Sequence, residues 1–107
     1  MTSAPMAPID GPMSLGETLD ALWATIESRG EASPEESYTA RLLLGPEDKL
    51  LKKIGEEATE VVMAAKDADK GQLLYEAGDL VYHLLVVMAR HGVSLDDLAV
   101  ELAARFK

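Results

Sequence analysis

The sequence predicts an all-α protein, an antiparallel bundle of about five helices. From residue 14 to the end of the chain, apolar residues recur every three or four positions, which is the spacing of an amphipathic helix. Capping residues and glycines divide this pattern into segments, and no segment alternates between apolar and polar residues as a strand does. The chain has 107 residues, 48% of them hydrophobic, which suits one small domain.

The first helix is predicted to begin after Ser14, because Ser14 and Glu17 form a capping box, and to end at Gly30. Residues 1–13 contain three prolines and no apolar period, so we expect a disordered tail there and one domain over residues 14–107. The apolar stripe of this helix consists of Leu15, Leu19, Leu22, Trp23 and Ile26.

Four further helices are expected from the same signals. Ser33 and Glu36 form a second capping box, with Pro34 at the first helical position. The predicted helices cover residues 34–44 with Gly45 as the stop, 46–66, 72–91 with Gly92 as the stop, and a last segment that starts at Ser94, with a break at residues 67–71.

The fourth helix is too apolar for a helix that buries one face only. On a helical wheel of about 100° per residue, its apolar residues cover roughly half of the circumference, with Val86 on the other side. A chain this small cannot cover that surface alone, so we expect a homodimer whose core contains the hairpin of the third and fourth helices. The residues concerned are Leu73, Leu74, Ala77, Leu80, Val81, Leu84, Leu85, Val87 and Met88.

Composition excludes several classes of protein. The chain has no cysteine, which rules out disulfides, thiolate metal sites and a cysteine nucleophile. No apolar run approaches 18 residues and no secretory signal opens the chain, so we expect a cytoplasmic protein with no membrane partner. A net charge of −9 disfavours nucleic acid as a partner. A phosphorylated substrate would require a recruited cation.

Four carboxylates are predicted to converge between the third and fourth helices. Glu57 and Glu60 share one helix face, as do Glu76 and Asp79, and both pairs border the apolar stripes of their helices. In an antiparallel hairpin that turns near residue 69, Glu60 and Asp79 should face each other, because each lies nine or ten residues from the turn. Such a cluster favours a hard divalent cation, and Mg²⁺ takes oxygen ligands.

Other interpretations stay open at this point. The four acids fit solvated surface pairs as well, and a di-iron site is disfavoured because it would require Glu-x-x-His on two helices. Lys53 fits either a phosphate contact or a salt bridge to Glu57, four residues on. His83, one turn beyond Asp79, fits a substrate contact or a structural hydrogen bond. The hydroxyl run Ser37-Tyr38-Thr39 is by itself an ordinary polar helix face.

At these residues the chain resembles the phosphoribosyl-ATP pyrophosphatase family of histidine biosynthesis, which belongs to the all-α MazG-like nucleotide pyrophosphohydrolases. The resemblance covers about residues 15–107 and departs from the family at Gly78, where Ala or Ser is frequent. Three stretches carry it: Ser37-Tyr38-Thr39-Ala40-Arg41-Leu42, Lys53-Ile54-Gly55-Glu56-Glu57-Ala58-Thr59-Glu60, and Glu76 to Val86.

The resemblance implies a stand-alone enzyme that hydrolyses phosphoribosyl-ATP to phosphoribosyl-AMP and pyrophosphate, the second step of the pathway. It implies that Glu57, Glu60, Glu76 and Asp79 hold Mg²⁺, and that Glu56 is a further ligand or a base. The implied catalytic residues are Glu56, Glu57 and Glu60, and the implied substrate-binding residues are Ser37, Tyr38, Thr39, Lys53 and His83.

Two other functions stay open. A MazG-like house-cleaning enzyme for nucleoside triphosphates would share the four acids, and a non-catalytic helical dimerisation module would leave them solvated.

Overall fold

The computed structural model describes residues 13–106, and this part of the chain consists of helices and turns with no strand, which confirms the all-α prediction. The predicted tail lies outside the described residues except for Met13. No helix in the described range is long and apolar enough to cross a membrane. The elements are α1 (Leu15–Ser28), the short 3₁₀ helix η1 (Arg29–Glu31), α2 (Tyr38–Leu44), α3 (Glu47–Lys66), α4 (Lys70–Arg90) and α5 (Leu95–Ala103).

Most of the predicted helix ends are confirmed. Ser14 and Glu17 form the expected capping box, and Ser94 forms another with Asp97 at the start of α5. Gly92 follows α4 with a φ of 70°, in the left-handed region where a residue without Cβ is favoured. The α1 helix ends two residues before Gly30, and its last carbonyls bond to the amide of Arg29 as the chain tightens into η1.

The predicted start of the second helix at residues 33–34 is wrong. Ser33 and Pro34 open a single isolated turn, and Ser37 then adopts an extended backbone that interrupts the helix. The hydroxyl of Ser37 accepts a hydrogen bond from the amide of Ala40 at 3.1 Å, so Ser37 caps α2. The α2 helix that starts here buries Thr39, Ala40 and Leu42.

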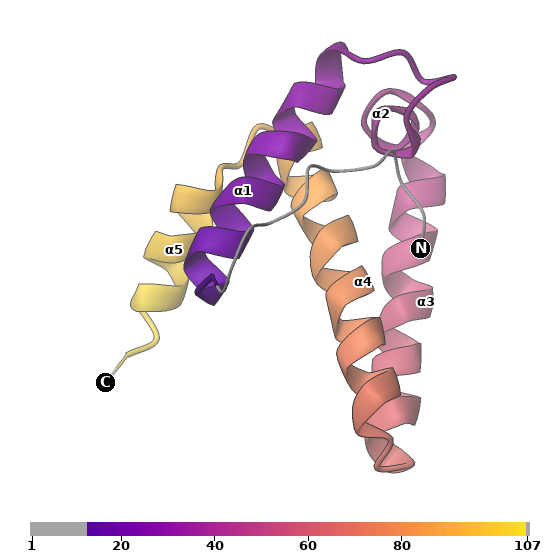
Figure 1. Cartoon of the computed structure of the whole chain (residues 1–107), viewed down its shortest axis with the longest axis vertical. Coiled ribbons are helices and arrows are strands. Elements are labelled where there is room, and N and C mark those ends of the chain that lie inside the picture. The colour runs from indigo at the N-terminus through magenta and orange to yellow at the C-terminus, as the bar shows by residue number, and fades with distance from the viewer. Residues whose placement is uncertain (1–12, 107) are drawn as a thin grey trace.

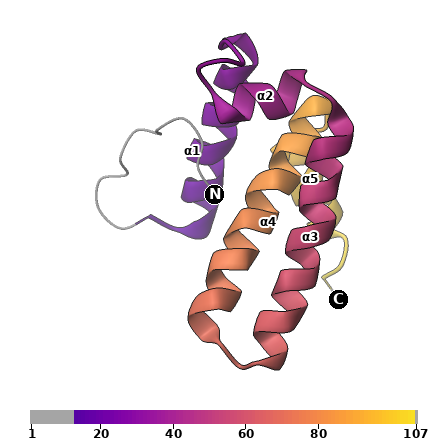
Figure 2. The same ribbon diagram turned by 90° about the vertical axis from the view of Figure 1, so that its right-hand side faces the viewer.

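The α3 and α4 helices form the most extensive packing contact of the described chain. They run antiparallel and are joined by a short turn at residues 67–69, as Figure 2 shows. The other helices gather around one half of this pair: α2 crosses its upper end, and α1 and α5 lie to one side (Figures 1 and 2). The half next to the turn projects beyond them.

The apolar core lies where α1, α2, α3 and α4 meet. Its buried members come from all four helices: Ile26, Leu42, Leu50, Tyr82, Leu85 and Val86. In α4, Val86 is completely buried, whereas Leu74, Val81 and Leu84 are exposed, so this single chain covers only part of the wide apolar surface of the helix. The core selects the face of α4 that carries Tyr82, His83 and Val86, since α2 and α3 cover that face.

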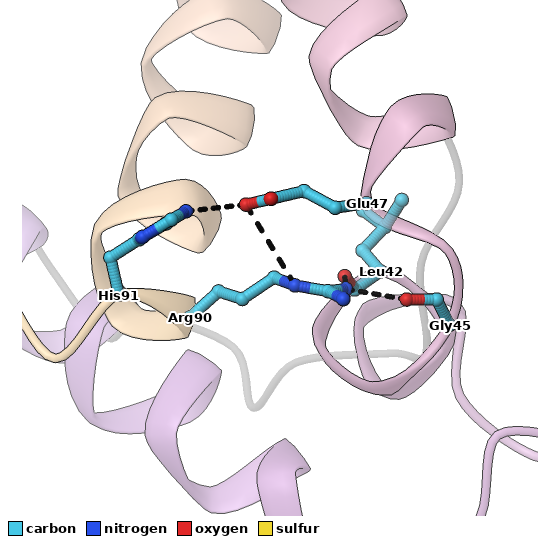
Figure 3. A network of polar contacts seen from close by, with 5 residues as sticks. All are labelled: Leu42, Gly45, Glu47, Arg90 and His91. Atoms are coloured by element: carbon cyan, nitrogen blue, oxygen red, sulfur yellow. Dashed lines mark hydrogen bonds and ion pairs between the residues drawn. The ribbon is translucent and has the colours of Figure 1, made fainter.

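Arg90 fastens the end of α4 to the α2–α3 connection (Figure 3). Its guanidinium donates to the carbonyl oxygens of Leu42 and Gly45 at 2.9 and 2.6 Å. Glu47, at the start of α3, lies 2.5 Å from the ring of His91 and 3.8 Å from Arg90. These contacts satisfy carbonyls at the end of α2 and fix where α3 begins.

Candidate active site

Contacts between α3 and α4 bring the predicted carboxylates to one region of the helix pair. Glu57 of α3 reaches His83 of α4, and Glu60 of α3 lies against Glu76 of α4. The charge of Asp79 acts on both Glu57 and Glu76 and raises the pKa of each. The antiparallel register therefore places all four carboxylates within interacting range.

Glu57 is held by a buried chain of polar contacts. The Nδ1 atom of His83 lies 2.7 Å from a carboxylate oxygen of Glu57 and 3.0 Å from the carbonyl of Asp79. Because both neighbours are acceptors, Nδ1 carries the hydrogen and donates it. The other ring nitrogen, Nε2, lies 3.0 Å from the hydroxyl of Tyr38. His83 is only 1% exposed, so its position between Tyr38 and Glu57 is fixed by packing on all sides.

Burial and charge raise the pKa of both Glu57 and Tyr38. For Glu57, burial raises the pKa and the nearby His83 opposes this effect, as does the ammonium group of Lys53 to a lesser degree. For Tyr38, burial is again the largest cause, followed by Tyr82 and the carboxylates of Glu57 and Asp79. The neutral forms of both groups are therefore stabilised relative to water.

Glu76 has the most perturbed carboxyl group of the site. The residue is 4% exposed, and the close approach of the Glu60 carboxyl group, then burial, then the charges of Glu60 and Asp79 raise its pKa to about 7. Gln72 donates to one oxygen of Glu76 at 2.9 Å, while the other oxygen, Oε2, is buried and has no hydrogen-bond partner. A buried carboxylate oxygen without a partner is costly unless a proton or a cation satisfies it.

The chemistry of these donors fits a hard cation. Carboxylate oxygens are the ligands that Mg²⁺ prefers, and the free oxygen of Glu76 points to a missing positive partner. As the side chains stand, no three acids or imidazoles within residues 13–106 are arranged around one point that an ion would occupy. Binding an ion would therefore require side-chain rotation, for which exposed Glu60 has the most freedom.

The remaining predicted residues divide into two groups. Tyr38 meets His83, and exposed Lys53 acts on Glu57, so both adjoin the carboxylates. The hydroxyls of Ser37 and Thr39 are buried and engaged elsewhere: Ser37 caps α2, and Thr39 is hydrogen-bonded to the hydroxyl of Tyr82. Exposed Glu56 lies beside Glu57 on α3, with its side chain facing solvent.

Two residues near the site were not anticipated from the sequence. Gln72 holds Glu76, and this contact was readable in principle, because residues four apart on one helix are neighbours. The hydroxyl of Tyr82 is hydrogen-bonded to Thr39, which lies 43 positions away in the sequence, and no local sequence pattern predicts such a contact.

Comparison with known proteins places these residues in a family. The profile described as phosphoribosyl-ATP pyrophosphohydrolase matches residues 19–106. Proteins named phosphoribosyl-ATP pyrophosphatase from Nitrosomonas eutropha and Dechloromonas aromatica are 49% and 44% identical, over 81% and 87% of this chain and 74% and 86% of their own. The protein of that name from Haloarcula marismortui is 47% identical over 84% of this chain and 94% of its own. The chain therefore belongs to the phosphoribosyl-ATP pyrophosphohydrolase family.

Proposed function

We propose that this chain hydrolyses phosphoribosyl-ATP to phosphoribosyl-AMP and pyrophosphate in the cytoplasm, with residues 14–107 as one catalytic domain. The chain belongs to the family, and its close matches all bear the same name, which supports phosphoribosyl-ATP as the substrate over other phosphoanhydrides. In the reaction, water attacks one of the two phosphorus atoms that are joined by the bridging oxygen between the α and β phosphates. The bond from that phosphorus to the bridging oxygen breaks, the bridging oxygen leaves with the other phosphate, and the proton lost by the water passes to a base or to solvent.

The observation that carries the proposal is the paired carboxylates between α3 and α4, with the unsatisfied oxygen of Glu76 among them. Glu57, Glu60, Glu76 and Asp79 are proposed to hold Mg²⁺. When bound, the ion would neutralise the charge of the phosphates and orient them for attack by water. This would reconcile a net charge of −9 with a polyphosphate substrate.

Other residues of this chain are proposed to support the reaction. Glu56 serves as a further ligand or as the base that accepts a proton from water, and Lys53 contacts a phosphate. His83 and Tyr38 hold Glu57 in place, with Tyr38 at the edge of the substrate site. Ser37 and Thr39 contribute by positioning Tyr38 at the start of α2.

The working form is proposed to be a homodimer. Exposed apolar side chains line the projecting half of the α3–α4 pair, which no other helix of the described chain covers. They include Val62 and Met63 on α3 and Leu74, Tyr75 and Val81 on α4.

A product assay tests the reaction. Purified protein with magnesium is given phosphoribosyl-ATP or ordinary nucleoside triphosphates, and pyrophosphate and orthophosphate are measured separately. We expect phosphoribosyl-AMP and pyrophosphate in equal amounts. Release of single orthophosphates would overturn the proposal. Equal turnover of deoxynucleoside triphosphates would favour the house-cleaning enzyme, and no turnover of any of them would favour the dimerisation module.

Thermal melting tests the metal separately from turnover. A ligand that binds only the native state raises the melting temperature, so millimolar magnesium should stabilise the protein relative to chelator. Glu60→Gln should remove this difference, whereas Glu36→Gln, the same change at an exposed acid outside the site, should keep it. Superimposable curves for the unaltered protein would contradict the metal site.

A further inference from the structure

Beside Tyr38 and Lys53 lies a pocket of about 330 Å³, to which no part of the substrate has yet been assigned. Its lining includes Arg41 of α2 and Lys49 and Lys53 of α3. We propose that this pocket binds the phosphorylated ribose arm of the substrate, with these three cations around its terminal phosphate. This inference rests on the proposed function and identifies which part of the substrate the site distinguishes.

The charge of the pocket is opposite to that of the protein. The chain has 10 lysines and arginines against 19 acids, yet three of these cations line this one pocket. None of the described residues that line it is an aspartate or glutamate. A phosphate monoester carries close to two negative charges near pH 7, so this is where such a group would be attracted.

The positions of the cations suit a fixed anion. Lys49 and Lys53 are four residues apart, and so project from the same face of α3. The guanidinium of Arg41 lies 5.6 Å from the centre of the Tyr38 ring and donates to the carbonyl of Pro34 at 2.9 Å. Arg41 is thereby held at the rim with donors left over, because a guanidinium carries five.

The pocket adjoins the carboxylate site through two of its lining residues. Tyr38 lines the pocket and also reaches His83, whose ring is bonded to Glu57. Lys53 lines the pocket as well, and its charge lowers the pKa of Glu57 against the effect of burial. A single substrate can therefore place its reacting phosphates at the carboxylates and another part of itself in the pocket.

The walls favour a sugar phosphate over free pyrophosphate. Apart from the cations, much of the lining consists of prolines and leucines, namely Pro34, Leu42, Leu44 and Pro46. A compact, strongly hydrated polyphosphate gains nothing from such walls, whereas the carbon face of a ribose does. The volume is at the lower end of the range for small-molecule sites, which suits one fragment of a larger substrate.

The test compares Lys49→Gln with Lys52→Gln, a matched control on the same helix that does not line the pocket. For each variant, kcat and KM are measured with phosphoribosyl-ATP. The inhibition constant of ATP, which lacks the additional phosphoribosyl group, is measured as that of a competitive inhibitor. Binding of ribose 5-phosphate and of pyrophosphate is followed by chemical-shift titration, which needs no turnover.

We expect Lys49→Gln to raise KM for phosphoribosyl-ATP about tenfold, the usual effect of losing one charge-assisted contact. The same variant should also bind ribose 5-phosphate more weakly, while kcat and inhibition by ATP stay unchanged. Lys52→Gln should behave like the unaltered protein in every measurement. Equal behaviour of the two variants would overturn the proposal. If Lys49→Gln weakened the binding of ATP and pyrophosphate as much as that of ribose 5-phosphate, the proposal would also be overturned, because the pocket would then hold the polyphosphate. If the protein released no pyrophosphate at all, the proposed function would fail. The titration with ribose 5-phosphate would still show whether the pocket binds a sugar phosphate.

Discussion

The surroundings of Glu76 indicate that the site requires a proton or a cation. One of its oxygens accepts from Gln72, the other has no hydrogen-bond partner, and the neighbouring Glu60 raises its pKa. In the absence of a cation, the folded chain keeps this group protonated to a higher pH than the unfolded chain does. The site is therefore strained by its own charge, and that strain is measurable without any substrate.

The pH dependence of stability follows from this. The pKa of Glu76 is raised from 4.5 to about 7, so between these pH values the folded chain binds a proton that the unfolded chain has released. The free energy of unfolding should consequently fall as the pH rises from about 4.5 to about 7, and then level off. Urea denaturation in chelator, repeated at several pH values, measures this slope.

Glu76→Gln should flatten this slope, because the amide does not titrate. Glu36→Gln, the same change at an exposed acid, should leave it intact. A metal-free protein whose stability rises steadily over this pH range would contradict the assignment of Glu76.

Glu57 and Asp79 should be needed for turnover rather than for folding. Glu57→Gln and Asp79→Asn each remove a charge that the proposed reaction uses, so we expect kcat to fall by about 100-fold or more. The helical circular dichroism should be retained, since neither change removes apolar packing. Full activity in either variant would contradict a role of that residue in the reaction. Glu36→Gln again serves as the control that we expect to be unaffected.

At the scale of elements, the turn between α3 and α4 sets the register of the carboxylates. Ala68 in this turn has a φ of 54°, a left-handed conformation that costs a residue with a Cβ roughly 1 kcal/mol or more. Ala68→Gly should therefore stabilise the protein by about 0.5 kcal/mol, after allowing for the added freedom of the unfolded chain.

The matched control is Ala65→Gly, one turn earlier in α3. Both alanines are exposed, and both changes remove the same methyl group. In the helix, however, glycine should lower the free energy of unfolding by about 0.5–1 kcal/mol. Denaturant titration should thus give effects of opposite sign, and the same sign for both would show that the turn is not strained.

The elements also show which features local sequence determines. The starts of α1 and α5 were predictable, because Ser14 and Ser94 bond to amides within three residues. The start of α2 was not, since two serines four residues apart both offer a cap, and only the burial of Thr39 and Ala40 selects Ser37. The burial of Val86 was not predictable for a related reason: a helical wheel measures the width of the apolar surface, whereas the neighbours that cover α4 decide which side is buried.

The candidate site was predictable to a similar extent. The spacing of Glu57, Glu60, Glu76 and Asp79 and a short turn were enough to place them on facing helices. The link from Tyr38 through His83 to Glu57 was not predictable, because it depends on how α2 crosses the α3–α4 pair, and that follows from the core.

At the scale of the whole molecule, apolar side chains of the described chain are exposed on several helices. They include the α3–α4 pair, where Leu74 is 76% exposed, and α5, where Val100 is 72% exposed. Burying either in a second copy would gain free energy in proportion to the apolar area removed from water. We propose the α3–α4 surface, because it projects beyond the other helices of the described chain (Figure 1).

Sedimentation velocity at micromolar concentration should give a mass twice that of the 11.5-kDa chain. Leu74→Glu should convert the protein to a monomer, because the interface would have to bury an unpaired charge, which costs several kcal/mol. Val100→Glu makes the same chemical change at an equally exposed position of α5 and should leave the dimer intact. Dissociation by Val100→Glu alone would move the interface to α5. A monomer before any substitution would contradict the proposed dimer and would mean that this apolar surface faces water.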